Sequence, residues 1–332
     1  METELKFAED ERLRKVNIAL VELEGIDWGR AAEVVPEALR NEVLQCARDA
    51  GAGAFGAFEA FEARIKAVRD MLRNGKYKPA GRAKPSSEYL FAAALDNSFP
   101  RVNPFVDAVN LASLKYMYPM SIFDADKAGH ALLCRLGAPG EYYVFNSSGQ
   151  EIDLEDLVCL CALAPAFAAE SAAKECALDA AGSAGADGRP TPGPNPLVTQ
   201  SFGDFAAGHP LPGSASQMAQ SFGEIEAGRP TPSPNPLVTQ SFGDIAAGRQ
   251  PHSHTETSQP EPRPHGRPIV NPVRDSMATK LFEGARNALI VVYAPGAPYE
   301  AEGRDLEAAA RDLAAWCGRA CERTAIKVYS LS

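Results

Sequence analysis

Polar side chains are concentrated in one stretch of this chain, Arg101–Lys127, where they stand among residues that form an apolar, core-like pattern. A polar group on a core-forming segment is costly to bury unless it finds a partner. The density therefore indicates a binding site or a polar network, and not a solvated face. The polar members are Asn103, Asp107, Asn110, Ser113, Lys115, Asp124, Asp126 and Lys127.

A second stretch with similar chemistry lies far along the chain, at Ile269–Pro295. Carboxylates and amides can hold a substrate ammonium group, and lysine or arginine can meet a phosphate or a developing oxyanion. We expect the two stretches to line one cavity. The candidate pocket residues are Asn103, Asp107, Asn110, Lys115, Asp124, Asp126, Asn271, Asp275 and Thr279, with Lys280 and Arg286 as cations beside them.

Several of these residues also have plain structural interpretations. Asn103 precedes Pro104 and fits the cap of a helix that begins there. Asp107 and Lys115 fit a structural ion pair with the second stretch. The Asp124-x-Asp126 pair fits a turn that is stabilised by side-chain hydrogen bonds.

Other kinds of site are not indicated. There is no GxSxG elbow, no GxxxxGK[ST] loop and no HExxH motif, so no catalytic residue is assigned. The 7 cysteines form no CxxC pair, which argues against a metal site. Gly51–Gly56 fits GxGxxG, but an expected helix precedes it where a dinucleotide site needs a strand, so no cofactor is predicted.

Composition separates one segment from the rest. Of the 26 prolines, 15 fall in residues 188–268, and 188–247 holds three 20-residue repeats built around Ser-Phe-Gly. Such a composition predicts disorder, so we expect 166–268 to be a low-complexity insertion, with the repeats offering a motif to a protein partner. The formal net charge is −10, and none of the segments 1–187, 188–268 and 269–332 is net positive, which argues against broad phosphate-backbone binding.

The remaining sequence predicts helices and strands that would position the polar residues. Apolar periodicity and caps indicate an α+β fold of mixed sheets with packed helices, in one domain made of residues 1–165 and 269–332. Helices are expected at 36–50, 55–73, 86–96, after Pro104 and after Asp305, and strands at 15–23, 121–123, 131–135, 288–294 and 325–331. No signal peptide or membrane span is predicted, because no apolar run is long enough.

The first stretch resembles the B3/B4 domain of the beta subunit of bacterial phenylalanyl-tRNA synthetases, a tRNA-binding and editing module that also occurs in free-standing proteins. The likeness is carried by Asn103-Pro104, Val106-Asp107, Asn110, Ser113-Leu-Lys-Tyr116, Pro119 and Asp124-x-Asp126-Lys127. Flanking matches are Pro85-Ser-Ser-Glu88 and, later, Arg274-Asp-Ser with Thr279-Lys280 and Arg286-Asn287. The resemblance covers residues 10–165 and 269–330.

The resemblance implies a cytoplasmic, free-standing protein that binds the acceptor end of tRNA and hydrolyses a mischarged amino acid. Lys280 and Arg286 would be its RNA contacts. The chain lacks the rest of a synthetase, so we do not expect it to charge tRNA. The alternative, which the acidic net charge favours, is a non-catalytic module that binds an amino-acid-like ligand, RNA or a protein.

Overall fold

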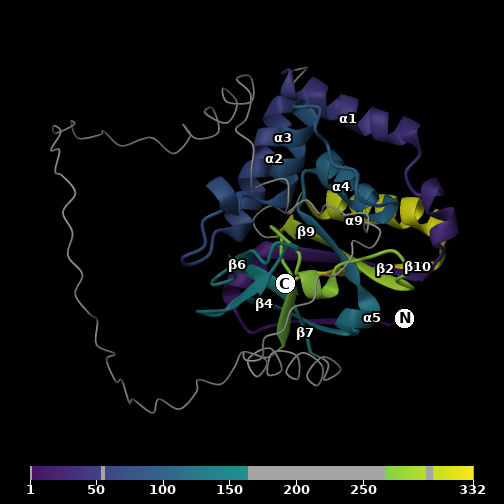
Figure 1. Ribbon diagram of the computed structural model, residues 1–332. Coiled ribbons are helices and arrows are strands. Elements are labelled where there is room, and N and C mark those ends of the chain that lie inside the picture. Colours follow the sequence, from purple (N-terminus) through teal and green to yellow (C-terminus); the bar gives the residue numbers. More distant parts are fainter. Residues whose placement is uncertain (1, 54–56, 164–265, 297–301, 332) are drawn as a thin grey trace, which may run out of the picture. The chain divides into compact units, whose positions relative to one another are not determined.

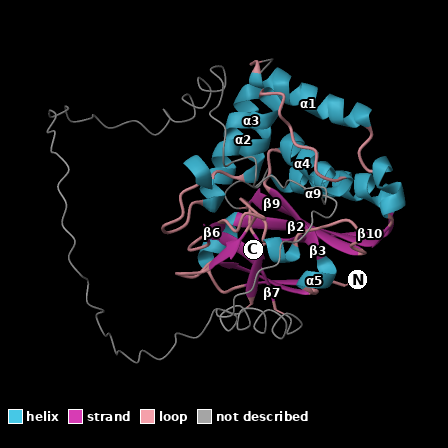
Figure 2. Ribbon diagram, in the orientation of Figure 1, coloured by secondary structure: helices cyan, strands magenta, loops and turns pink. Residues whose placement is uncertain are grey.

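The computed structural model describes residues 2–53, 57–163, 266–296 and 302–331, which form a mixed α+β fold as predicted (Figures 1 and 2). The helices are α1 (Glu37–Gly51), α2 (Ala57–Leu72), α3 (Ser86–Leu95), α4 (Pro104–Tyr116), α5 (Ala125–Ala128) and α9 (Glu302–Cys317). The strands are β1 (Glu4–Phe7), β2 (Val16–Ile26), β3 (Met120–Asp124), β4 (Ala131–Leu136), β5 (Tyr142–Val144), β6 (Glu151–Asp153), β7 (Val158–Ala162), β8 (Arg267–Val270), β9 (Asn287–Pro295) and β10 (Cys321–Tyr329).

Two four-stranded sheets carry the core. The antiparallel sheet β10-β2-β9-β3 is covered on one face by helices that include α4 and α9 (Figure 2). The sheet β1-β4-β7-β8 lies beyond its other face, where Tyr293 of β9 approaches Cys134 of β4 and Cys159 of β7. Because β9 is covered on both faces, it is a continuous apolar run, ALIVVYA, without an alternating pattern.

Strands from either side of residues 164–265 pair with each other. β9 lies between β2 and β3, and β8 pairs with β7. This pairing carries the second polar stretch beside the first. Most of the predicted insertion, up to residue 265, lies outside the described residues. Its expected end at residue 268 is too late, because Arg267 and Pro268 already belong to β8. No helix in the described ranges is both long and apolar enough to span a bilayer.

Helix α4 begins and ends as local rules require. The side chain of Asn103 accepts a hydrogen bond from the Val106 amide at 3.0 Å, and Pro104 occupies the first turn. Met117 ends the helix in the left-handed conformation with φ 53°, two residues before Pro119. The helix therefore has well-defined ends, and it packs against the strand β3 that follows.

Side-chain hydrogen bonds confirm the turn expected at Asp124-x-Asp126. The Asp124 carboxylate accepts hydrogen bonds from the amides of Asp126 and Lys127, and it also caps the short helix α5. Helix α3 begins after Pro85, which occupies its cap position without a side-chain hydrogen bond, and Ser87 is buried.

The loop between α2 and α3, residues 73–84, depends on Gly75. This residue has φ +40°, and an added Cβ would lie 2.0 Å from the Asp156 carboxylate, which accepts a hydrogen bond from the Lys76 amide at 2.7 Å. We expect Gly75→Ala to lower the free energy of unfolding by about 2–4 kcal/mol, because the clash displaces a loop anchor and adds to the strain of a left-handed alanine.

Gly81 of the same loop is the matched control for that change. It has φ +57°, and an added Cβ would meet nothing within 4 Å. Gly81→Ala should therefore carry only the backbone strain of a left-handed alanine, about 1 kcal/mol. Equal losses for the two variants in urea unfolding would contradict the anchoring role of Asp156.

Candidate functional site

A cavity of about 180 Å³ lies where the two polar stretches meet. Its walls come from α3, α4, β3 and the segment between β8 and β9. The lining residues are Ser86, Leu90, Val102, Asn103, Val106, Val109, Asn110, Met120, Ile122, Phe145, Asn271, Val273, Arg274, Asp275, Lys280, Leu281, Phe282 and Glu283. An apolar cavity of about 150 Å³ suffices for benzene, so this one has room for an amino-acid side chain.

Most of the wall is apolar. Val106 and Val109 stand one turn apart on α4, and Met120 and Ile122 alternate along β3, so both elements turn a hydrophobic face to the cavity. Leu90 of α3 adds to that surface. Such a wall favours the aliphatic or aromatic part of a small ligand.

Two acids among the described residues line the cavity, Asp275 and Glu283, and Asp275 is the less exposed of them. Burial raises the pKa of Asp275 to about 7, although hydrogen bonds from the Ser121 hydroxyl and the Ile122 amide, together with the charge of Lys280, lower it. Near neutral pH the carboxyl can therefore exist in either protonation state. Its charged form is the natural partner of a ligand ammonium group.

Lys280 supplies a cation beside Asp275. Its Nζ donates to the Phe145 carbonyl at 3.1 Å and lies 3.2 Å from the Met277 sulfur. The positive charge of Lys280 lowers the pKa of Asp275, so the two groups are close enough to interact electrostatically. One part of the cavity thus holds opposite charges, an arrangement complementary to an amino acid or its ester.

Three asparagines from the two stretches line the cavity with different roles. Asn103 is held by its cap, and the Asn271 Oδ1 accepts from the amides of Val273 and Arg274 at 2.8 and 2.9 Å. Asn110 differs: it is 9% exposed, and its Nδ2 has no hydrogen-bond partner among the described residues. A buried amide without a partner is costly, so Asn110 is available to a ligand.

The structure brings five of the predicted residues together: Asn103, Asn110, Asn271, Asp275 and Lys280. Asp107 and Lys115 are corrections, because neither lines the cavity. Asp107 accepts from the Val102 amide at 2.8 Å and lies 3.6 Å from Arg40 of α1. Lys115 pairs with Asp312 of α9 at 2.7 Å. The alternative ion pair with the second stretch is also wrong for both.

The other predicted residues also lie outside the cavity lining. Asp124 caps α5 and pairs with Lys127 at 3.0 Å, while exposed Asp126 accepts from Asn287 at 2.9 Å. Thr279 is buried, and its hydroxyl donates to the Ile269 carbonyl at 3.5 Å. Arg286 lies in a separate depression with Gly25 and Glu322, because a turn at 282–285 carries the chain away from Lys280.

Sequence reasoning missed Ser86, Phe145 and Arg274. Ser86 lines the cavity with a buried hydroxyl that has no hydrogen-bond partner among the described residues. Phe145 and Arg274 line the cavity together, with the Arg274 guanidinium 4.3 Å from the ring centroid. Arg274 stands in the Arg-Asp-Ser motif next to Asp275, so its position in the sequence indicates that it can lie at the cavity. Nothing local marks Phe145.

In the described part of the chain no group of three or more His, Cys, Asp or Glu residues is placed to hold a metal ion.

Residues 78–171 match the family model of the B3/4 domain, the domain of the phenylalanyl-tRNA synthetase beta subunit. The matched range contains the first polar stretch but ends before the second. The family is associated with tRNA binding. No curated protein matches the chain.

Proposed function

We propose, on the premise that residues 78–171 form a B3/4 domain, that this chain is a free-standing editing protein that hydrolyses mischarged aminoacyl-tRNA. The proposal includes one discontinuous domain, residues 1–165 and 269–332, acting in the cytoplasm. The observation that carries it is the cavity itself. Its apolar wall suits an amino-acid side chain, and Asp275 beside Lys280 suits the ammonium and ester groups.

The reaction needs little from the protein. An aminoacyl ester is already activated, so a positioned water can attack the carbonyl carbon while the bond to the ribose oxygen breaks. The departing ribose oxygen takes up one proton of that water and becomes a hydroxyl, and the amino acid leaves as a carboxylate while the second proton passes to solvent. Asp275 would hold the substrate ammonium, and Lys280 would stabilise the developing oxyanion.

A binding module for an amino-acid-like ligand is the second candidate. The observation that favours it is the chemistry of the cavity wall: its described residues include no histidine and no cysteine, and hence no imidazole base or thiol nucleophile. In this reading Asp275 and Lys280 bind a free amino acid by its two charged groups. Turnover separates the two functions.

The test is a deacylation screen with a panel of mischarged tRNAs. We expect release of the amino acid from at least one member, at a rate well above spontaneous hydrolysis. Binding of amino-acid analogues without any release would replace the hydrolase with the binding module. A panel with neither release nor binding would remove both functions from this cavity.

A further inference from the structure

A wider groove of about 750 Å³ adjoins the cavity and shares Phe145 and Arg274 with it. One side is the loop between α2 and α3, which contributes Lys76, Lys78 and Arg82. The facing side comes from β6 and the residues after it, with Glu151, Asp153 and Glu155. The groove is therefore divided by charge into a basic wall and an acidic wall.

The basic wall is a local feature that the acidic net charge conceals. Residues 73–84 contain five cations and no acid, namely Arg73, Lys76, Lys78, Arg82 and Lys84, in a chain whose formal net charge is −10. Lys76 is neutralised by Glu155 at 2.7 Å. Lys78 and Arg82 are exposed and form no ion pair with any described residue.

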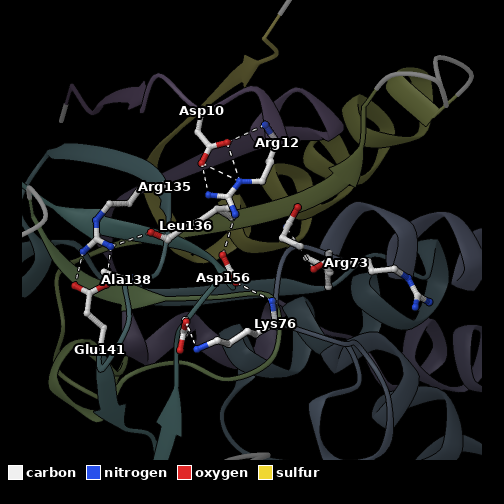
Figure 3. Close-up of polar contacts among 12 residues, drawn as sticks. Asp10, Arg12, Arg73, Lys76, Arg135, Leu136, Ala138, Glu141 and Asp156 are labelled. Atoms are coloured by element: carbon white, nitrogen blue, oxygen red, sulfur yellow. Dashed lines mark hydrogen bonds and ion pairs between the residues drawn. The ribbon is translucent and has the colours of Figure 1, made fainter.

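The loop that carries these cations is anchored from several sides. Asp156 accepts from the Lys76 amide at 2.7 Å and from Arg12 Nη1 at 2.9 Å, and Arg12 in turn bonds Asp10 (Figure 3). Lys15 donates to the Arg73 carbonyl at 3.0 Å. Tyr77 donates its hydroxyl to the Ala83 carbonyl within the loop. An anchored basic loop loses little conformational entropy when it binds an anion.

Arg274 lies where the groove meets the cavity. Its guanidinium packs over the Phe145 ring, and it hydrogen bonds with the Tyr89 hydroxyl. Guanidinium planes and aromatic rings are the surfaces on which single-stranded bases stack. The groove thus combines phosphate-binding cations with a stacking platform at the mouth of the cavity.

We infer that this groove, and not the surface at Arg286, holds the single-stranded 3′ end of an RNA. Lys78 and Arg82 contact backbone phosphates, and Arg274 stacks the terminal base, so that the group esterified to the last ribose enters the cavity. The inference rests on the proposed function for the identity of the strand. The acidic wall repels phosphate and restricts the backbone to the loop side.

Binding of an uncharged, fluorescently labelled single-stranded RNA that ends in CCA tests this inference separately from hydrolysis. The double variant Lys78→Ala, Arg82→Ala should weaken binding about 10-fold near 0.1 M salt. It should also lower the slope of log K against log salt concentration by about 1.4, since each phosphate contact on a single strand accounts for about 0.7.

The matched control removes two exposed cations elsewhere, Arg286→Ala with Arg319→Ala, and should leave both affinity and slope within about twofold. The inference is overturned if the control loses as much affinity as the groove variant, or if neither variant changes it. Dependence on Lys78 and Arg82 without any deacylation would keep the groove and remove the hydrolase. Deacylation by a protein whose RNA binding does not depend on Lys78 and Arg82 would keep the hydrolase and remove the groove.

Discussion

Asp275→Asn should lose at least about 100-fold in kcat/KM for deacylation while gaining stability at pH 8. The activity is lost because the substrate ammonium would enter a largely buried site without its counter-charge, and breaking such a pair costs about 3–5 kcal/mol. The gain in stability follows from the raised pKa of Asp275, about 7, because the fold disfavours the charged carboxyl.

The sign of the stability effect follows from proton linkage. Between pH 4 and pH 7 the unfolded chain releases the Asp275 proton while the folded chain retains it, so the wild-type protein loses stability as pH rises. The asparagine variant cannot ionise and escapes that loss. Its advantage should reach about 2–4 kcal/mol at pH 8 and shrink toward pH 4.

Urea unfolding at several pH values and deacylation at pH 8 measure the two effects. Asp126→Asn is the matched control, because Asp126 is exposed and lies outside the cavity lining. It should leave both quantities near those of the wild-type protein. An Asp275→Asn variant that is active, or that is less stable at pH 8, would contradict the assigned environment of this carboxyl.

Filling the cavity should abolish ligand binding without unfolding the protein. Val106 lines the cavity from α4, and tryptophan at this position would occupy much of the space of about 180 Å³. We expect Val106→Trp to reduce deacylation and analogue binding by more than about 100-fold, because the apolar part of the ligand loses its site. Deacylation and calorimetric titration of a non-hydrolysable analogue measure this loss.

Val144→Trp provides the comparison for that variant. Val144 is 37% exposed on β5 and is not part of the cavity wall. The substitution adds the same bulk outside the proposed site and should preserve activity. Thermal unfolding of both variants separates blockage from misfolding. Full activity in a folded Val106→Trp protein would place the substrate elsewhere.

Local rules in the sequence predicted much of the fold. The Asn103-Pro104 start of α4 follows from capping chemistry, and its cap bond is present. The apolar run of β9 and the helices α1 and α2 follow from periodicity, each within a few residues. The order of the strands in the sheets could not be predicted in this way. β9 pairs with β2 and β3 across long sequence separations, which no local pattern encodes.

Helix geometry explains which of the predicted α4 residues line the cavity. Asn103, Val106 and Asn110 follow the spacing of one α4 face, and all three line the cavity. Lys115 is five residues beyond Asn110, which places it about 140° around the helix, and it meets α9 instead. Asp107 lies one residue past Val106, about 100° away, and turns to Arg40.

The basic loop of the groove does not stand out in the net charge of a long segment. The cations of residues 73–84 are diluted by the acids of residues 1–72 and 85–187, so the total hides them. The loop is recognisable only when residues 73–84 are considered by themselves. Its position beside the cavity is a tertiary fact, set by the anchors to Asp156 and Lys15, which lie far from the loop in sequence.

The most direct test is a crystal structure of the protein with a 3′-aminoacylamido-adenosine, a non-hydrolysable analogue chosen from the deacylation screen. We predict that the amino-acid side chain lies in the cavity between Val106 and Ile122, with its ammonium nitrogen about 3 Å from the Asp275 carboxylate. An analogue bound away from Asp275, with this cavity left empty, would contradict the account.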